Sequence, residues 1–192
     1  MARIETEQSE SRFILSRFFS KPGSLVLPDS KAHLMFWSLM AGGLALDLWT
    51  KKAIFGWLGP HEIYPVIDGF LQFVPALNNG AAFGWFAGKS YFLTAVSVIA
   101  TLAIFALFLF GGGRQRLVHI ALGLFAAGVC GNLYDRVFND GSVRDFIDVY
   151  YRSYHWHTFN VADSLLCAGV GLLILSTFLT EKPAQTRDPQ RK

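Results

Sequence analysis

Four long apolar runs, separated by polar segments, form the hydropathy pattern of this chain. They lie at about residues 32–49, 91–110, 117–133 and 162–179. The second run contains no charged residue, and its length matches the roughly 20 residues that a helix needs to cross a bilayer. The pattern therefore predicts a multi-pass, all-α membrane protein with four transmembrane helices.

The segment from residue 54 to residue 89 has a different pattern. Prolines and glycines interrupt it at Pro60, Pro65, Gly69, Pro75 and Gly80, which excludes a long helix. Residues 64–77 are rich in β-branched and aromatic side chains, as short strands are. We expect a small β lobe outside the membrane.

The overall composition agrees with a membrane protein. Charged residues make up 16% of the chain and apolar residues 52%, whereas charged residues are about a quarter of a soluble domain. The net charge of +3 is small and the basic residues are scattered, which argues against a nucleic-acid partner. Cys130 and Cys167 both lie in apolar runs, where free cysteines behave as small core residues.

The distribution of basic residues predicts the orientation in the membrane. Of the 17 Lys and Arg residues, eleven lie in the two tails and the 111–116 turn, and six lie in the opposite loops. Because basic loops stay in the cytoplasm, both termini are predicted to be cytoplasmic. The predicted organisation is a polar cytoplasmic tail at 1–31, a four-helix transmembrane domain at 32–181, and a cytoplasmic tail at 182–192.

Charged side chains cluster between the last two apolar runs, at residues 131–164. Such residues at the mouth of an apolar bundle are costly unless they have a function. Asp145 and Asp163 would meet there if the runs pack side by side. Two close carboxyl groups share one proton and can act as general base and general acid around a water molecule. Asp163 lies in the first turn of the fourth run, where the helix dipole favours its anionic form.

Structural roles are the alternative explanation of the same residues. Asp163 or Asn160 would cap the fourth helix, and Asp145 would pair with Arg144 or Arg136 in a solvated loop. Asp47 and Lys51, four residues apart, would form an interfacial ion pair on one helix face. Three further carboxylates compete for the catalytic role, namely Asp135, Asp140 and Asp148. Spacing alone does not select the pair.

Four motifs in order resemble those of bacterial lipoprotein signal peptidase, also called signal peptidase II. They are Asn78-x-Gly80-Ala81-Ala82-Phe83, Gly128-x-x-Gly131-Asn132-Leu133-Tyr134-Asp135-Arg136, Val143-x-Asp145-Phe146 and Phe159-Asn160-x-Ala162-Asp163-Ser164. Leu48 and Asn79 depart from the residues usual in that family, which are Gln and Thr. Neither departure touches the two aspartates.

The resemblance implies a fold, an activity and roles for particular residues. The fold would be four transmembrane helices with a small extracytoplasmic β-cradle. The domain at 32–181 would be an aspartyl endopeptidase without metal or other cofactor. The catalytic residues would be Asp145 and Asp163. The substrate-binding or supporting residues would be Asn78, Asn132, Arg136, Asn160, Asp47 and Lys51. Asp135 would have a structural role beside Arg136 or a neighbouring backbone group.

The resemblance also implies a substrate and a location. The enzyme would be a monomer in the bacterial cytoplasmic (inner) membrane, in contact with membrane lipid and with its active site at the outer face. It would remove the signal peptide of a prolipoprotein before a diacylglyceryl-modified cysteine.

The main alternative is a small proton-coupled transporter component, and a membrane scaffold is a third interpretation. A transporter would carry acids at mid-span depth. The second run has none, which favours the enzyme.

Overall fold

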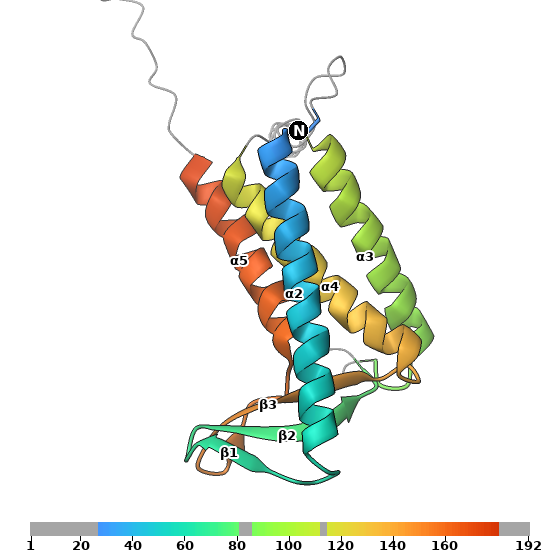
Figure 1. Ribbon diagram of the computed structural model, residues 1–192, viewed down its shortest axis with the longest axis vertical. Helices are drawn as coiled ribbons and strands as arrows, with labels where there is room; N and C mark the ends of the chain where they lie inside the picture. The colour runs from blue at the N-terminus through green and yellow to red at the C-terminus, as the bar shows by residue number, and fades with distance from the viewer. Residues whose placement is uncertain (1–26, 81–85, 112–114, 181–192) are drawn as a thin grey trace, which may run out of the picture.

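Four long helices and one small sheet make up the computed structural model, which describes residues 27–80, 86–111 and 115–180. The helices are α2 (Ser30–Trp57), α3 (Ser90–Phe110), α4 (Arg116–Phe138) and α5 (Val161–Thr180). They lie side by side, and the sheet crosses one end of the bundle (Figure 1). The predicted tails, apart from residues 27–31, and part of the first motif, residues 81–83, lie outside the described residues.

Among the described residues, three helices are long and apolar enough to cross a membrane: α3, α4 and α5. This finding supports a membrane protein with several spans. Helix α2 is long enough, but it lacks a stretch as apolar as those of these three helices, and it carries Asp47, Lys51 and Lys52. It also continues to Trp57, so the beginning of the segment predicted as a β lobe is helical.

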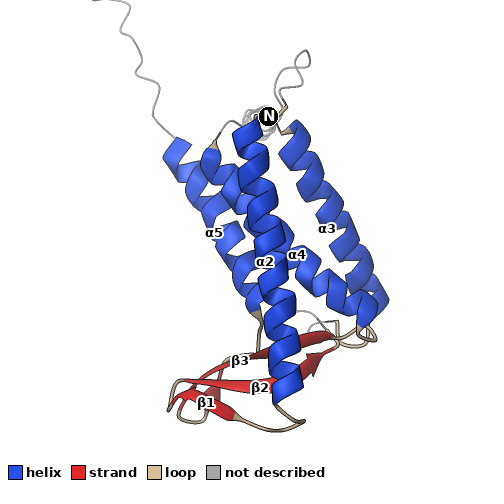
Figure 2. Ribbon diagram, in the orientation of Figure 1, coloured by secondary structure: helices blue, strands red, loops and turns tan. Residues whose placement is uncertain are grey.

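The sheet has four antiparallel strands in the order β1 (Tyr64–Ile67), β2 (Leu71–Asn78), β3 (Val143–Tyr151) and β4 (Tyr154–His155). Figure 2 shows the strands gathered at one end of the helical bundle, at the level of the last turns of α2. The sequence predicts strands only before residue 78, and it places the residues of β3 in an outward loop. The pairing of β3 with β2 sets Ala76 opposite Asp145 and Asn78 opposite Val143.

Helix α4 occupies the centre of the bundle because its small residues let neighbouring helices approach. A side chain at Gly128 would meet Ala162 and Leu166 of α5, and one at Gly131 would meet the Asp47 carboxylate of α2. Small residues are common at such helix contacts in membranes. The close approach brings polar groups of α2, α4 and α5 together near the sheet.

Candidate active site

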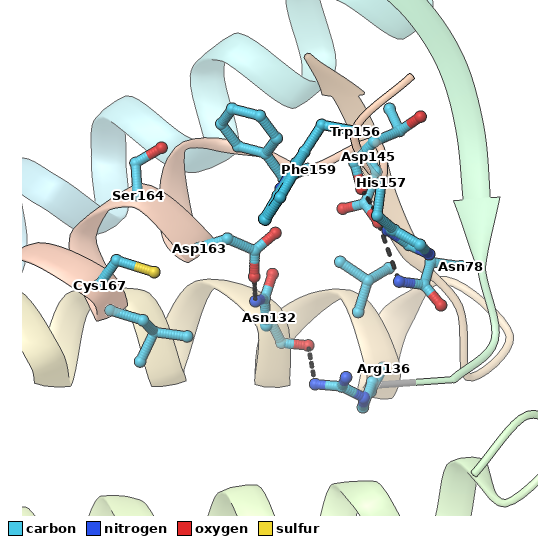
Figure 3. A pocket seen from close by; sticks show the side chains of 13 residues that line it. Asn78, Asn132, Arg136, Asp145, Trp156, His157, Phe159, Asp163, Ser164 and Cys167 are labelled. Atoms are coloured by element: carbon cyan, nitrogen blue, oxygen red, sulfur yellow. Dashed lines mark hydrogen bonds between the residues drawn. The ribbon is translucent and has the colours of Figure 1, made fainter. Parts of the chain in front are cut away.

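A cavity of about 470 Å³ lies where α4, α5 and β3 meet. Its polar lining includes Asn78, Asn132, Arg136, Asp145 and Asp163, all of them predicted site residues (Figure 3). Apolar side chains complete the wall, among them Val143, Phe159 and Leu166. The structure thus brings the two predicted catalytic aspartates into one mostly apolar hollow.

Asp163 is fixed by the start of α5. The Asn160 backbone N–H donates to Asp163 Oδ2 at 3.1 Å, and the Asp163 backbone N–H donates to Asn160 Oδ1 at 3.0 Å. This reciprocal pair is a capping box, which satisfies backbone donors that a helix start leaves free. Asn132 Nδ2 donates to the other oxygen, Asp163 Oδ1, at 2.8 Å. The capping role and the place in the cavity therefore belong to the same residue.

Asp145 is fixed from both sides by asparagine amides. Asn160 Nδ2 donates to Oδ1 at 2.6 Å and Asn78 Nδ2 donates to Oδ2 at 3.0 Å. The side chain lies on β3 in a residue that is only 2% exposed, so the expectation of a solvated loop pair with Arg144 or Arg136 is wrong.

The environment of Asp145 shifts its carboxyl group toward the protonated form. Burial raises the pKa of this carboxyl group to about 6, and the negative charge of Asp163 contributes to the rise, while the hydrogen bonds from Asn78 and Asn160 oppose it. Desolvation and a like charge are the two general reasons why a carboxyl group retains its proton. One cavity thus holds two carboxyl groups, one of which has a strongly raised pKa.

This raised pKa predicts the pH dependence of catalysis. A carboxyl group is protonated below its pKa, so if catalysis needs the Asp145 proton, kcat/KM should fall as the pH rises through about 6. Asn78→Ala removes a hydrogen bond that lowers this pKa, so it should move the fall to higher pH. Rates measured across the pH range on both proteins test this shift. An unchanged or lower midpoint in Asn78→Ala would contradict the assignment.

Lys51 forms a buried ion cluster outside the cavity lining. Its Nζ lies 2.8 Å from Asp47 Oδ2 and 3.2 Å from Asp135 Oδ2, and all three side chains are 0% exposed. The expectation of an ordinary interfacial ion pair is therefore wrong in one respect, since the pair is fully buried. Asp47 Oδ1 also accepts the Ala162 backbone N–H at 2.8 Å, which ties α2 to the first turn of α5.

Asp135 pairs with Arg144, whereas the expected partner was Arg136 or a neighbouring backbone group. Its Oδ1 accepts from Arg144 Nε at 3.1 Å and Nη2 at 2.6 Å, and its Oδ2 accepts the Arg144 backbone N–H at 2.9 Å. Arg136 instead donates to the Gly80 carbonyl at 3.2 Å and the Asn132 carbonyl at 3.5 Å. The neighbouring backbone group foreseen for Asp135 is that of Arg144.

The rival carboxylates lie elsewhere. Asp140 lies in the turn before β3, and Asp135 belongs to the ion cluster. Asp148 is 5% exposed on β3, where it accepts from Gln72 Nε2 at 2.7 Å and contacts His155 Nδ1 at 2.8 Å. Among the carboxylates of the described part of the chain, Asp145 and Asp163 line the cavity and these three do not.

Sequence reasoning missed one wall of the cavity. Trp156, His157 and Thr158 line it from the segment before α5. They immediately precede the Phe159-Asn160 motif, and this adjacency was the available signal. Cys167, expected as a core residue, is exposed and also lines the cavity.

The fold and the cavity define the class of protein. Two carboxyl groups around one cavity, one with a raised pKa, form an arrangement that aspartyl peptidases use, and the three long apolar helices indicate a membrane protein. Comparison with known proteins narrows this class. Residues 39–179 match the family model described as signal peptidase (SPase) II, and the chain belongs to that family.

Individual relatives agree with the family match. A lipoprotein signal peptidase of Geobacter sulfurreducens is 41% identical over 153 residues, covering 78% of this chain and 95% of the relative. One of Rhodopirellula baltica is 40% identical over 167 residues, covering 79% and 74%. A bacterial membrane enzyme solved in meso at 2.3 Å resolution superposes with a TM-score of 0.72 at 30% identity, covering 79% of this chain and 92% of the other. These matches do not support the transporter alternative.

Proposed function

We propose that this membrane peptidase cleaves prolipoproteins with Asp145 and Asp163 as its catalytic pair, releasing the signal peptide before a diacylglyceryl-modified cysteine. Family membership supports the removal of signal peptides from prolipoproteins. The observation that carries the residue assignment is the cavity itself. Both carboxyl groups line it, and each of their four oxygens accepts a hydrogen bond from Asn78, Asn132 or Asn160.

The two carboxyl groups would divide the chemistry of hydrolysis. Ionised Asp163 accepts a proton from the attacking water molecule while the oxygen of that water forms a bond to the scissile carbonyl carbon. Protonated Asp145 hydrogen-bonds the carbonyl oxygen and supplies the proton that the leaving amine needs when the C–N bond breaks. The raised pKa of Asp145 supports this division, because it keeps a proton available. Because the two carboxyl groups interact, the shared proton belongs to the pair and not to one residue.

The remaining predicted site residues would support this pair. Asn132 and Asn160 orient the carboxylates, since their amide nitrogens donate to them. Asn78 does the same from β2. Arg136 lines the cavity and is hydrogen-bonded only to backbone carbonyls in the described part of the chain. Its positive charge acts on both carboxyl groups and would also attract the carbonyl oxygens of the substrate backbone.

The proposed substrate approaches from the lipid. Diacylglyceryl chains would remain in the bilayer beside α5, and the scissile bond would reach the cavity at the end of the bundle. The apolar cavity wall and exposed apolar residues of α5, such as Val170 and Ile174, support this approach. The working unit would be a monomer surrounded by membrane lipid, since one chain supplies both carboxyl groups.

The substrate proposal predicts a strong dependence on lipid modification. Each buried CH₂ group contributes about 0.8 kcal/mol to membrane anchoring, so a diacylated substrate is concentrated at the cavity while an unmodified one is not. Purified enzyme should cleave the modified prolipoprotein with a kcat/KM about 100-fold or more above that of the unmodified form. Equal cleavage of the two forms at equal concentration would overturn the substrate assignment.

We also propose the location and orientation suggested by the basic residues. All four long helices, including α2, would span the inner membrane as one domain at 32–181, with the tails 1–31 and 182–192 in the cytoplasm. The sheet and the cavity would then lie at the outer face. The sheet and the start of α4 lie at opposite ends of the bundle, which supports this arrangement (Figure 1).

Labelling of single cysteines tests the orientation. In a background with Cys130→Ala and Cys167→Ala, Ser153→Cys lies in the turn between β3 and β4, and Gln115→Cys precedes α4. In intact spheroplasts, an impermeant thiol reagent should label the first and spare the second. After permeabilisation both should react, which controls for accessibility. Labelling of Gln115→Cys alone in intact spheroplasts would reverse the proposed topology.

A further inference from the structure

Lys51 contacts the proposed catalytic machinery although it does not line the cavity. Its Nζ donates to Asn132 Oδ1 at 3.1 Å, in addition to its ion pairs with Asp47 and Asp135. An ammonium group has three donors and no acceptor. The three oxygens around Nζ therefore match its donors in number, although Asp47 Oδ2 is paired with it by charge and accepts no hydrogen bond in the described part of the chain.

The contact with Lys51 determines which way the Asn132 amide points. Asn132 Oδ1 also receives Asn160 Nδ2 at 3.1 Å, so two donors converge on this oxygen. A flipped amide would turn its NH₂ group toward both donors and its oxygen toward the Asp163 carboxylate. Orientation of amides follows from such networks of donors and acceptors. Only the observed orientation lets Asn132 Nδ2 donate to Asp163 Oδ1 at 2.8 Å.

The same network reaches the second carboxyl group. Asn160, whose Nδ2 donates to Asn132 Oδ1, also donates from Nδ2 to Asp145 Oδ1 at 2.6 Å. A chain of hydrogen bonds thus runs from Lys51 to both carboxyl groups of the cavity. Hydrogen bonds in buried networks of this kind strengthen one another.

The charges around Lys51 keep it in place. Asp47 and Asp135 supply the negative charges and Lys51 and Arg144 the positive ones, so the cluster carries no net charge when all four are ionised. Removing Lys51 alone would leave buried carboxylates partly uncompensated, which destabilises a protein strongly. A test of the role of Lys51 must therefore preserve this balance.

We infer that Lys51 is a positioning residue, which fixes the Asn132 amide and, through Asn132 and Asn160, the geometry of Asp163 and Asp145. This inference rests on the proposed catalytic pair. Because Lys51 is 0% exposed and absent from the cavity lining, it does not meet the substrate. Its loss should therefore lower kcat and leave KM nearly unchanged, as expected for an interaction that serves the transition state.

The decisive variant is Asp47→Asn/Lys51→Met. It removes one charge of each sign, and the amide introduced at position 47 retains an oxygen that can accept the Ala162 N–H and hold the start of α5. Lys52→Met is the matched control, since it removes the neighbouring, exposed lysine of the same helix. Both proteins and the single variant Lys51→Met are purified, their melting temperatures recorded, and kcat and KM measured with diacylglyceryl-modified prolipoprotein.

We expect kcat of folded Asp47→Asn/Lys51→Met to fall by about 10- to 100-fold. A loss of this size is typical when a catalytic group loses one oriented hydrogen-bond donor or shifts by about 1 Å. In an Asn132→Ala background the same double change should lower kcat by less than about threefold, because residues acting as a unit are non-additive. Lys52→Met should behave as wild type. A purely structural role would instead change the folded fraction and the melting temperature, with kcat per folded molecule preserved.

Three results would overturn the inference. They are wild-type kcat in the folded double variant, an undiminished effect in the Asn132→Ala background, and failure of both Lys51 variants to fold while Lys52→Met is normal. The last result would assign Lys51 to folding alone. Failure of the wild-type enzyme to cleave the modified prolipoprotein would instead reject the proposed function, so the two failures are distinguishable.

Discussion

Asp145→Asn and Asp163→Asn are each expected to reduce cleavage of modified prolipoprotein by about 10⁴-fold or more, since loss of one member of a catalytic unit removes most of its effect. Water activation and protonation of the leaving amine need two carboxyl groups that share a proton. Asn preserves the size of the side chain and one acceptor oxygen, but it cannot exchange the proton. The double variant should be little worse than either single variant. Turnover should be measured per folded molecule in purified protein.

Two other aspartates serve as controls for this experiment. Asp140 lies in a turn at a φ of 49°, a left-handed conformation that Asn adopts readily, so Asp140→Asn should be neutral. Asp148→Asn should retain most turnover because Asp148 is absent from the cavity lining. The stability of the Asp148→Asn protein should fall, however, since Asp148 is buried against Gln72 and His155. Substantial turnover in Asp163→Asn, or none in folded Asp148→Asn, would mean that the assigned pair is wrong.

The helices were predictable because their signal is local. An apolar run long enough to span a bilayer leaves few alternatives, and the predicted run at 91–110 matches α3 (Ser90–Phe110) closely. Strand β3 gave no comparable signal. Its sequence, Val-Arg-Asp-Phe-Ile-Asp-Val-Tyr-Tyr, lacks a regular alternation, and the strand is defined by pairing with β2, far away in the chain. Sheet pairing of this kind depends on tertiary contacts that sequence patterns do not contain.

The residues of the candidate site that belong to sequence motifs were predictable. Contacts that depend on the geometry of a turn were not. Asp135 was expected beside Arg136, its neighbour on α4, but successive residues of a helix point in different directions. The chain instead reverses after Phe138, where Asn139 N–H donates to the Asp135 carbonyl and Ser142 N–H donates to the Asn139 carbonyl. This turn brings Arg144 back over Asp135. Its geometry, with Asp140 at positive φ, is not readable from spacing.

The ion cluster gives the second large expected effect, this time on stability. Asp135→Asn should lower the free energy of unfolding by about 3–5 kcal/mol, the usual cost of breaking a buried ion pair by removing one partner. The amide introduced at position 135 would keep one acceptor, but its NH₂ group would face either the Lys51 ammonium or the Arg144 guanidinium, both of which are donors. Thermal unfolding in detergent, with Asp140→Asn as the control outside the cluster, measures the difference.

Turnover per folded molecule should change less than stability in Asp135→Asn, because Asp135 touches neither the cavity nor the two catalytic candidates. Asn132 Oδ1 can still accept the hydrogen bond from Lys51 Nζ. Asn78 and Asn160 can still donate to the two oxygens of Asp145. The Arg144 backbone N–H can still donate to the side-chain oxygen of the Asn introduced at position 135, so the start of β3 keeps this hydrogen bond. A stable Asp135→Asn protein without turnover would instead show that Asp135, and not only Lys51 among the members of the ion cluster, is needed for hydrolysis.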